Sequence, residues 1–193
     1  MKRVGITGGI GSGKSLVCKI LGILGIPVFS ADEEARKLLD EKPVMQAIRK
    51  HFGERVFTGE RVDRKKLAGI VFSDKQALLQ LNRLVHPLLS RRFDQWVAGW
   101  SHEIPYVVID AALLIESRQY FPLDHLVLVY SPVEERIARV MKRDGISREE
   151  ILLRMSNQMP EEEKMQYVHT ILYNDSEHFL LPQILAMDGK LRS

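Results

Sequence analysis

Short apolar runs alternate along the chain with longer stretches whose apolar residues recur at helical spacing. Residues 3–7 form the first apolar run and predict a strand, and residues 13–24 follow with the spacing of a helix. Residues 27–30 predict a second strand, and Ser30 and Glu33 have the spacing of a capping box that begins another helix. The chain therefore opens as strand, helix, strand, helix.

The pattern changes between residues 43 and 99, where helices follow one another and no strand is expected. Gly53 and Gly59 supply turns in this stretch. Ser73 is expected to cap a helix, and Pro87 is expected to begin the next one. We therefore expect an all-helical insert after the second strand.

Strands return at residues 106–110 and 125–130, and residues 170–173 form a last short strand before a closing helix. Pro132 is expected at the first position of a charged helical segment, in which Ser147 begins another helix with a capping box. Strands that alternate with helices predict an α/β fold in which a parallel sheet carries helices on both faces.

The bulk properties favour a globular protein that binds anions. The 193 residues are 45% apolar, carry a formal net charge of +3 and include one cysteine, Cys18, which is expected to pack rather than to react. The tightest basic run, Arg64-Lys65-Lys66, is short for a nucleic-acid surface. No apolar stretch approaches the ~20 residues that cross a bilayer. A soluble, cytoplasmic protein with no nucleic-acid or membrane partner is therefore expected.

One segment carries a specific chemical signature. Residues 8–15 read Gly-Gly-Ile-Gly-Ser-Gly-Lys-Ser and match the phosphate-binding pattern G-x-x-x-x-G-K-[ST] between an apolar strand and a helix. The glycines let backbone N–H groups surround a phosphate at the positive end of the helix. Lys14 is expected to reach the β- and γ-phosphates of ATP, and Ser15 to bind Mg²⁺. The sequence therefore predicts a P-loop kinase that acts on a small hydroxylated acceptor.

Two carboxylates follow predicted strands. Asp110 ends an apolar strand in the form of a Walker B motif, where an acid holds Mg²⁺ directly or through water, although a buried strand with a capping acid would look the same. Asp32 follows the second strand and enters the first turn of a helix. It could accept the proton of the acceptor hydroxyl, or it could only favour the helix N-terminus by ~0.3–1 kcal/mol. Both interpretations stay open for each acid.

Three arginines, Arg136, Arg139 and Arg143, recur at the spacing of one helical face. Three like charges on one face repel one another unless an anion binds there, and the oxygens of a triphosphate could be that anion. The alternative is a solvated helix side that Glu134 and Glu135 partly neutralise.

Taken together, these segments resemble the dephospho-CoA kinase family over nearly the whole chain. The segments that carry the resemblance are residues 6–15, Ala31-Asp32, Val62-Asp63-Arg64-x-x-Leu67, Ile70-Val71-Phe72, Leu81-Asn82-x-x-Val85-His86-Pro87, Leu113-Leu114-x-Glu116, Arg139-x-x-x-Arg143-Asp144, Arg154-x-x-x-Gln158, Lys164 and Asn174. The loop alone fits many families, whereas the His-Pro, Leu-Leu-x-Glu and Arg-x-x-x-Gln segments in this order are far more specific.

The resemblance implies a single P-loop NTPase domain with a three-layer, adenylate-kinase-like core. The core is expected at residues 1–42, 103–131 and 165–193, a helical substrate-binding insert at 43–102 and a helical lid at 132–164. The implied reaction moves a phosphoryl group from ATP to the ribose 3′-hydroxyl of dephospho-CoA. A monomer or a small homo-oligomer is expected.

The resemblance also implies roles for single residues. Asp32 would be the general base, Arg139 and Arg143 would belong to a mobile lid over ATP, and His86 would shape the CoA-side pocket. The expected nucleotide contacts are Gly9, Gly11, Ser12, Gly13, Lys14, Ser15, Leu16 and Asn174, and the expected metal ligands are Ser15 and Asp110.

The chain departs from the family pattern at three positions. A proline is usual where Ala112 stands, a glutamine where Arg136 stands and a glycine where Ser176 stands. Because of its departure, Arg136 is left out of the expected site.

Other functions would leave different marks on the sequence. A kinase for another small acceptor would share the loop and differ in the insert. A regulatory GTPase needs Asn-Lys-x-Asp and Asp-x-x-Gly, and neither tetrapeptide occurs. A nucleic-acid-binding ATPase would need a basic stripe and stacking aromatics, whereas aromatic residues make up only 7% of this chain.

Overall fold

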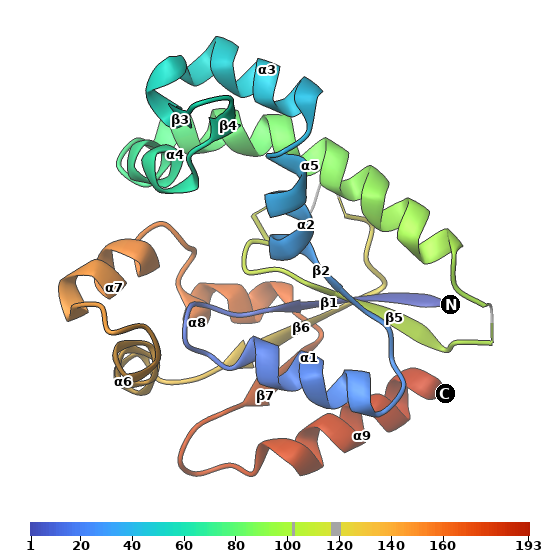
Figure 1. The fold of residues 1–193 in the computed structure, drawn as a ribbon. Helices are drawn as coiled ribbons and strands as arrows, with labels where there is room; N and C mark the ends of the chain where they lie inside the picture. The colour runs from blue at the N-terminus through green and yellow to red at the C-terminus, as the bar shows by residue number, and fades with distance from the viewer. Residues whose placement is uncertain (102, 117–120) are drawn as a thin grey trace. The chain divides into compact units, whose positions relative to one another are not determined.

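The computed structural model describes residues 1–101, 103–116 and 121–193, which divide into two compact units. The first unit, Met1–Ser30 with Trp96–Ser193, contains β1 (Lys2–Thr7), α1 (Lys14–Ile23), β2 (Val28–Ser30), β5 (Tyr106–Asp110), β6 (His125–Tyr130), α6 (Val133–Asp144), α7 (Arg148–Met155), α8 (Glu161–Lys164), the 3₁₀ turn η3 (Met165–Tyr167), β7 (Thr170–Tyr173) and α9 (Leu180–Arg192) (Figure 1). The second unit, Ala31–Gln95, contains α2 (Ala31–Leu38), α3 (Lys42–Phe52), η1 (Glu54–Val56), β3 (Phe57–Thr58), β4 (Arg61–Val62), α4 (Arg64–Val71) and most of α5 (Lys75–Ala98). The second unit therefore begins with α2, ahead of the insert boundary at residue 43.

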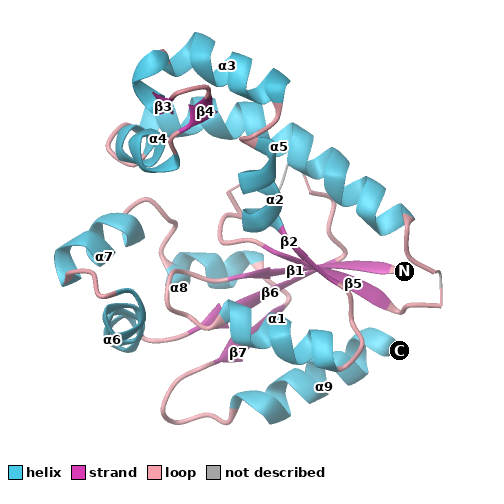
Figure 2. Ribbon diagram, viewed as in Figure 1, coloured by secondary structure: helices cyan, strands magenta, loops and turns pink. Residues whose placement is uncertain are grey.

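The first unit is built on a five-stranded parallel sheet in the order β2-β5-β1-β6-β7 (Figure 2). This confirms the α/β fold with a parallel sheet. In the sheet β1 pairs with β5 on one side and with β6 on the other, so it is the middle strand. Because all the strands run in the same direction, the segment that follows β1 leaves the sheet at the centre of its carboxyl edge.

Helices α1 and α9 lie together on one face of this sheet, as Figure 1 shows, and form the main core of the first unit with it. Ile6, Leu21 and Ile184 are fully buried there. Each side chain of this size stabilises the fold by about 1.5–3 kcal/mol when it leaves water. The hydroxyl of Tyr106 donates to Asp188 Oδ1 at 2.6 Å and so ties β5 to α9.

The charged helical segment after β6 has the expected helix starts, with one shift. The Oγ of Ser147 accepts the N–H of Glu150 at 3.2 Å, and Glu150 Oε2 accepts the N–H of Ser147 at 3.1 Å, which confirms the capping box of α7. Pro132 is the cap of α6 instead of its first helical residue. Its extended ψ of 144° keeps it outside the helix, while its carbonyl accepts the first helical N–H, from Arg136, at 3.0 Å.

The second unit has its own apolar core, and it contains a strand pair that the sequence did not predict. Val44 and Ile48 of α3 and Leu67 of α4 are buried in this core. Between the helices β3 and β4 form an antiparallel hairpin in which Phe57 pairs with Val62. The expectation of helices without strands was wrong here, because two-residue strands are too short to show a period-two pattern.

Helix α5 corrects two further expectations. It runs unbroken from Lys75 to Ala98 with Pro87 inside it, so no new helix begins at the proline. A proline inside a helix costs ~3 kcal/mol, and the stripe of buried side chains that continues across it offsets this cost. That stripe consists of Val85, Leu89 and Phe93.

The cap of α5 is also different from the expected one. Asp74 Oδ1 accepts the N–H groups of Gln76 at 2.8 Å and Ala77 at 3.3 Å. Ser73, which was expected to cap this helix, instead donates its hydroxyl to the carbonyl of Gly69 at the end of α4. An aspartate next to the serine is the stronger acceptor for two N–H groups because it is charged.

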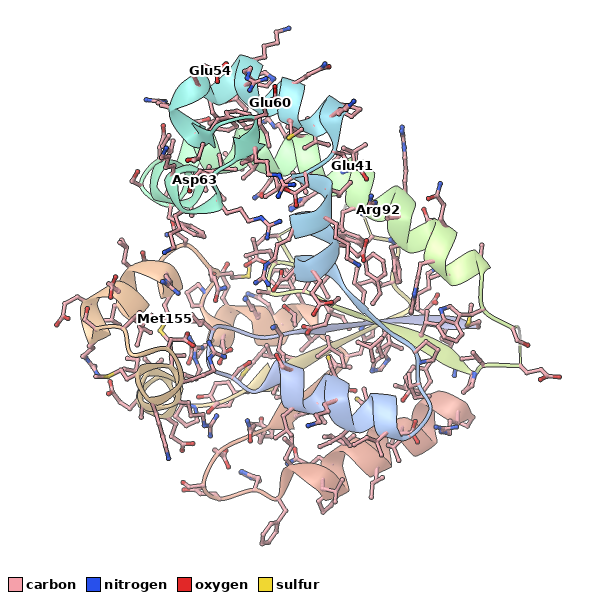
Figure 3. All side chains as sticks on the ribbon, in the orientation of Figure 1. Glu41, Glu54, Glu60, Asp63, Arg92 and Met155 are labelled. Atoms are coloured by element: carbon pink, nitrogen blue, oxygen red, sulfur yellow. The ribbon has the colours of Figure 1, made fainter. Side chains whose placement is uncertain are left out.

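Arg92 ties the helices of the second unit together. It lies beside Glu41 in Figure 3 and forms ion pairs with Glu41, just before α3, and with Glu34 of α2, the latter at 3.0 Å. Pairing with Lys37 and Arg92 lowers the pKa of the Glu34 carboxyl. Helices α2, α3 and α5 are thus joined by one guanidinium.

Candidate active site

The segment between β1 and α1 is a loop whose glycines cannot be replaced without strain. Gly11 and Gly13 have φ values of +81° and +101°, which L side chains rarely adopt. A β-carbon on Gly11 would lie 2.6 Å from the carbonyl oxygen of Arg136, and one on Gly13 would collide with the side chain of Asn174. The neighbours of the loop therefore approach its backbone as closely as glycine allows.

Several backbone N–H groups of this loop have no partner within the described residues. The N–H of Gly9 donates to Glu161 Oε1 at 2.6 Å, that of Ile10 to Gln158 Oε1 at 3.3 Å and that of Ser12 to the carbonyl of Gly9 at 3.1 Å. No hydrogen bond in the described part of the chain uses the N–H groups that remain. Those of Gly11, Gly13, Lys14 and Ser15 are among them. Unpaired N–H groups at a helix N-terminus form an anion site.

The side chains around the loop add charge to these donors. Lys14 Nζ lies 3.3 Å from Asp110 Oδ1 at the end of β5, and both side chains are mostly buried. This Asp110 oxygen and the hydroxyl oxygen of Ser12 are buried without a hydrogen-bond partner among the described residues. Ser15 and Leu16 are exposed in the first turn of α1. The sequence motif thus brings a cation, a carboxylate and a hydroxyl to one end of the sheet.

Cys18 lies in the same region but is not a nucleophile. Burial and the neighbouring Asp110 charge raise the pKa of its thiol far above the usual range. The thiol therefore stays protonated and packs within the core of α1, as expected.

Arg139 joins the loop to two other elements. Its guanidinium donates to Ser131 Oγ at 2.8 Å, to Glu135 Oε2 at 2.7 Å and to the carbonyl of Asn174 at 2.9 Å, with a longer contact of 3.4 Å to the carbonyl of Gly11. The side-chain amide of Asn174 donates to the carbonyl of Ser12 at 2.7 Å. Both residues, expected at the nucleotide, are therefore brought to the loop.

The three arginines of α6 have different surroundings. Arg136 and Arg139 lie at the loop, whereas Arg143 is 63% exposed and pairs with its neighbour Asp144 at 2.7 Å. Each has its own carboxylate, because Arg136 pairs with Glu161 and Arg139 with Glu135. These carboxylates relieve the repulsion between the arginines without a bound anionic ligand. The repulsion is therefore no evidence for a triphosphate at this helix face. The argument for a phosphate site rests on the unpaired N–H groups instead.

The structure adds residues that the sequence expectations left out. Arg136, excluded because of its departure from the family pattern, is 5% exposed and lies flat against Gly9. Glu161 is 3% exposed, and Lys164, which is fully buried, lies 3.7 Å from Glu116 Oε1. Burial lowers the pKa of Lys164. No periodic pattern could reveal these contacts, because they join segments far apart in the chain.

Asp32 and His86 belong to the second unit. Asp32 is exposed in the first turn of α2, and it follows Ser30 of β2, the Cα partner of Asp110 in the sheet, by two positions. His86 lies inside α5, half-buried, and burial lowers the pKa of its imidazole. It does not lie at a junction between two helices.

The first unit also has a cavity of about 500 Å³ at the opposite edge of its sheet. Lys2, His125 and Thr170, at the starts of β1, β6 and β7, line it together with α9. The phosphate loop follows the carboxyl end of β1, so this cavity is separate from it.

The described residues contain neither a metal-ligand cluster nor a membrane-spanning helix. No group of three or more His, Cys, Asp and Glu side chains among them is placed to hold a metal ion. None of the helices in the described ranges is long and apolar enough to cross a membrane.

Comparisons with known proteins agree with this geometry. Residues 2–179 match the family described as dephospho-CoA kinase. A dephospho-CoA kinase from Bacteroides fragilis is 39% identical over 191 residues, which cover 96% of this chain and 90% of the relative. Among solved structures, the protein TT1252 from Thermus thermophilus has a TM-score of 0.83 and 37% identity, with 98% of this chain and 96% of that chain covered. Dephospho-CoA kinase from Campylobacter jejuni has a TM-score of 0.70 and 26% identity, with the same coverage.

Proposed function

The chain belongs to the dephospho-CoA kinase family and phosphorylates dephospho-CoA with ATP in coenzyme A biosynthesis; from this premise we propose which of its groups carry the reaction. The phosphate cradle is the loop from Gly8 to Ser15. The observation that carries this proposal is the set of unpaired N–H groups at the start of α1, with Lys14 beside them. The acceptor is the 3′-hydroxyl of the ribose.

Lys14 is the mobile charge of the cradle. It pairs with Asp110, and its flexible stem would let the ammonium follow the phosphoryl group during transfer. Preorganised donors of this kind stabilise the charge that develops in the transition state. Gly11, Gly13 and Ser15 are proposed to supply backbone donors, and Leu16 and Asn174 are proposed to contact the rest of the nucleotide.

Magnesium fits the oxygens that this site offers. The carboxylate of Asp110, whose buried Oδ1 has no hydrogen-bond partner among the described residues, and the hydroxyl of Ser15 would hold the ion. Hard oxygen ligands suit Mg²⁺, which takes few ligands from a protein and completes its shell with water and phosphate. When bound, the ion neutralises part of the phosphate charge.

Asp32 is the proposed general base. A carboxylate just beyond the carboxyl end of β2 is well placed in this fold class to orient the acceptor hydroxyl and take its proton. His86 and the helices of the second unit are proposed to bind the CoA part of the acceptor.

Arg139 is proposed to stabilise the phosphate charges, and Arg143 to join it when the segment beyond α6 closes. The support for Arg139 is its direct contact with the loop. Arg143 is exposed near the end of α6 and would have to leave Asp144 to reach a nucleotide. Binding energy of a triphosphate can drive such an exchange of partners.

The proposal is tested by ADP release in the presence of ATP and Mg²⁺. Dephospho-CoA should support turnover, whereas adenosine, pantetheine and a nucleoside monophosphate should not. The 3′-deoxy analogue of dephospho-CoA should be inert and the 2′-deoxy analogue should react, because only the former lacks the proposed nucleophile. Turnover of the 3′-deoxy analogue would refute the assignment of the 3′-hydroxyl. Efficient turnover of another small alcohol would instead favour a kinase with a different acceptor.

A further inference from the structure

A buried ion pair between Glu161 and Arg136 contacts the phosphate loop, and the proposed function gives it no role. Glu161, the first residue of α8, accepts the N–H of Gly9 with one carboxylate oxygen at 2.6 Å. Its other oxygen lies 2.7 Å from Nη1 of Arg136, on α6. With exposures of 3% and 5%, both side chains are almost completely removed from water. A buried ion pair is costly to desolvate, and apolar side chains of similar volume would often be at least as stable, so stability alone is a weak reason for this pair.

Arg136 also touches the loop directly. The central carbon and both terminal nitrogens of its guanidinium lie 2.9–3.0 Å from the point where a β-carbon on Gly9 would stand. The plane of the guanidinium therefore covers Gly9, and the backbone carbonyl oxygen of Arg136 lies closer still to Gly11, 2.6 Å from the point where a β-carbon on Gly11 would stand. A lysine could supply the charge but not this flat contact.

Helix α8, which carries Glu161, is itself fixed to the segment that follows β5. Lys164 Nζ lies 3.5 Å from the carbonyl of Ala112 and 3.7 Å from Glu116, both in the segment after β5. Glu116 in turn accepts the N–H of Met159 at 3.2 Å. Glu161 therefore has little freedom to leave the loop.

We propose that Arg136 and Glu161 form a positioning pair for the nucleotide, in which Glu161 holds Gly9 in place and Arg136 cancels the charge of that carboxylate. A carboxylate bonded to a phosphate loop repels a triphosphate unless a cation balances it. The loop gains its fixed shape from Glu161, and it keeps its affinity for anions because of Arg136. The N–H groups of Gly11, Gly13, Lys14 and Ser15 stay available for phosphate.

This inference rests on the proposed nucleotide site and makes a prediction that depends on the sign of the charge. Arg136→Gln removes the cation that is in direct contact with the Glu161 carboxylate, leaving only the interaction with Lys164, and should weaken ATP binding by roughly tenfold. Glu161→Gln leaves the guanidinium unbalanced and should leave ATP binding unchanged or tighten it. The double variant, Arg136→Gln with Glu161→Gln, should bind ATP more weakly than Glu161→Gln and more tightly than Arg136→Gln. A pair with a purely structural role predicts no dependence on sign.

Calorimetric titration with ATP and Mg²⁺, together with melting temperature, measures these effects without the acceptor. Asp188→Asn is the matched control, because it weakens a buried hydrogen bond in the same unit, between β5 and α9. It should lower the melting temperature and leave ATP affinity within about twofold of the wild type, since its contacts lie outside the loop. If both single variants weaken ATP binding equally, in step with their loss of melting temperature, the proposal is refuted.

If Arg136→Gln does not fold, the proposal can still be tested by comparing the ATP affinity of Glu161→Gln with that of the double variant. The charge-balancing role is overturned if the double variant binds ATP as tightly as Glu161→Gln or more tightly. Failure of the proposed function would look different, because the wild-type protein itself would not bind ATP.

Discussion

Asp32→Asn is the substitution that most directly tests the mechanism. The amide keeps the size of the side chain and can still lie in the first turn of α2, but it cannot take a proton. The fold and the affinity for ATP should therefore persist, while phosphoryl transfer to the acceptor should slow. The alternative is that Asp32 serves only the helix, as one of three acids in that turn.

The expected magnitudes separate these two roles. Loss of a general base slows turnover by roughly 10²–10⁴, which corresponds to about 2.7–5.5 kcal/mol in the activation free energy. Loss of an exposed acid at a helix N-terminus changes the free energy of unfolding by only ~0.3–1 kcal/mol. In a domain of this size such a change lowers the melting temperature by about 1–4 °C. The two roles thus affect different measurements by clearly different amounts.

Glu33→Gln is the matched control, because Glu33 is exposed in the same helical turn and its substitution removes the same charge. Turnover with saturating dephospho-CoA and ATP should be measured beside melting temperature for both variants. If Asp32 is the base, the two variants should melt alike and differ in turnover by two or more orders of magnitude. If Asp32→Asn is as active as Glu33→Gln, the assignment fails and Asp110 becomes the next candidate.

Three further outcomes are expected. Lys14→Ala should lower kcat/KM by about 10²–10³, the usual effect of losing one preorganised donor, and a variant with near-normal turnover would contradict the phosphate cradle. Before ATP is added, hydrogen exchange should be slow in the first two turns of α6, because Ile137 and Val140 are buried there. Addition of ATP should slow exchange mainly in α7. If ATP has no effect on exchange in α7, the proposed closure of the segment beyond α6 is contradicted. Burial, His169 and Lys2 lower the pKa of His125, so its contribution to stability is kept above about pH 6.5 and lost as the pH falls through the lower folded-state pKa. His125→Gln should therefore flatten the pH dependence of the melting temperature between about pH 5 and 7, and an unchanged slope would contradict this.

The parts of the fold that the sequence predicted well are those with a local physical cause. The strands β5, β6 and β7 begin and end at the predicted residues, because each is a short apolar run buried in a parallel sheet. The phosphate loop was predictable from eight consecutive residues between a strand and a helix. The capping box at Ser147 was equally local.

The features that the sequence did not predict depend on contacts between distant segments. Pro87 stays inside α5 because buried side chains on both sides of it are worth more than one helical hydrogen bond. The β3–β4 hairpin has strands too short to leave a pattern. Arg136 was set aside as a departure from the family, yet its partner Glu161 makes it a buried part of the loop's surroundings. A substitution can only be judged together with the residue that it contacts.

The cations of the proposed nucleotide site share one property that would constrain how a nucleotide binds. Lys14 pairs with Asp110, Arg136 with Glu161, Arg139 with Glu135 and Arg143 with Asp144. A triphosphate therefore meets balanced charges, and it must exchange partners with carboxylates instead of filling a strongly positive cleft. Exchange is easiest for the exposed pair on Arg143 and hardest for the buried pair on Arg136, because desolvated ions are costly to separate. The loop can thus keep a fixed shape through its most buried pair, Arg136 with Glu161, while Lys14 and the more exposed Arg139 and Arg143 are proposed to move to the phosphates.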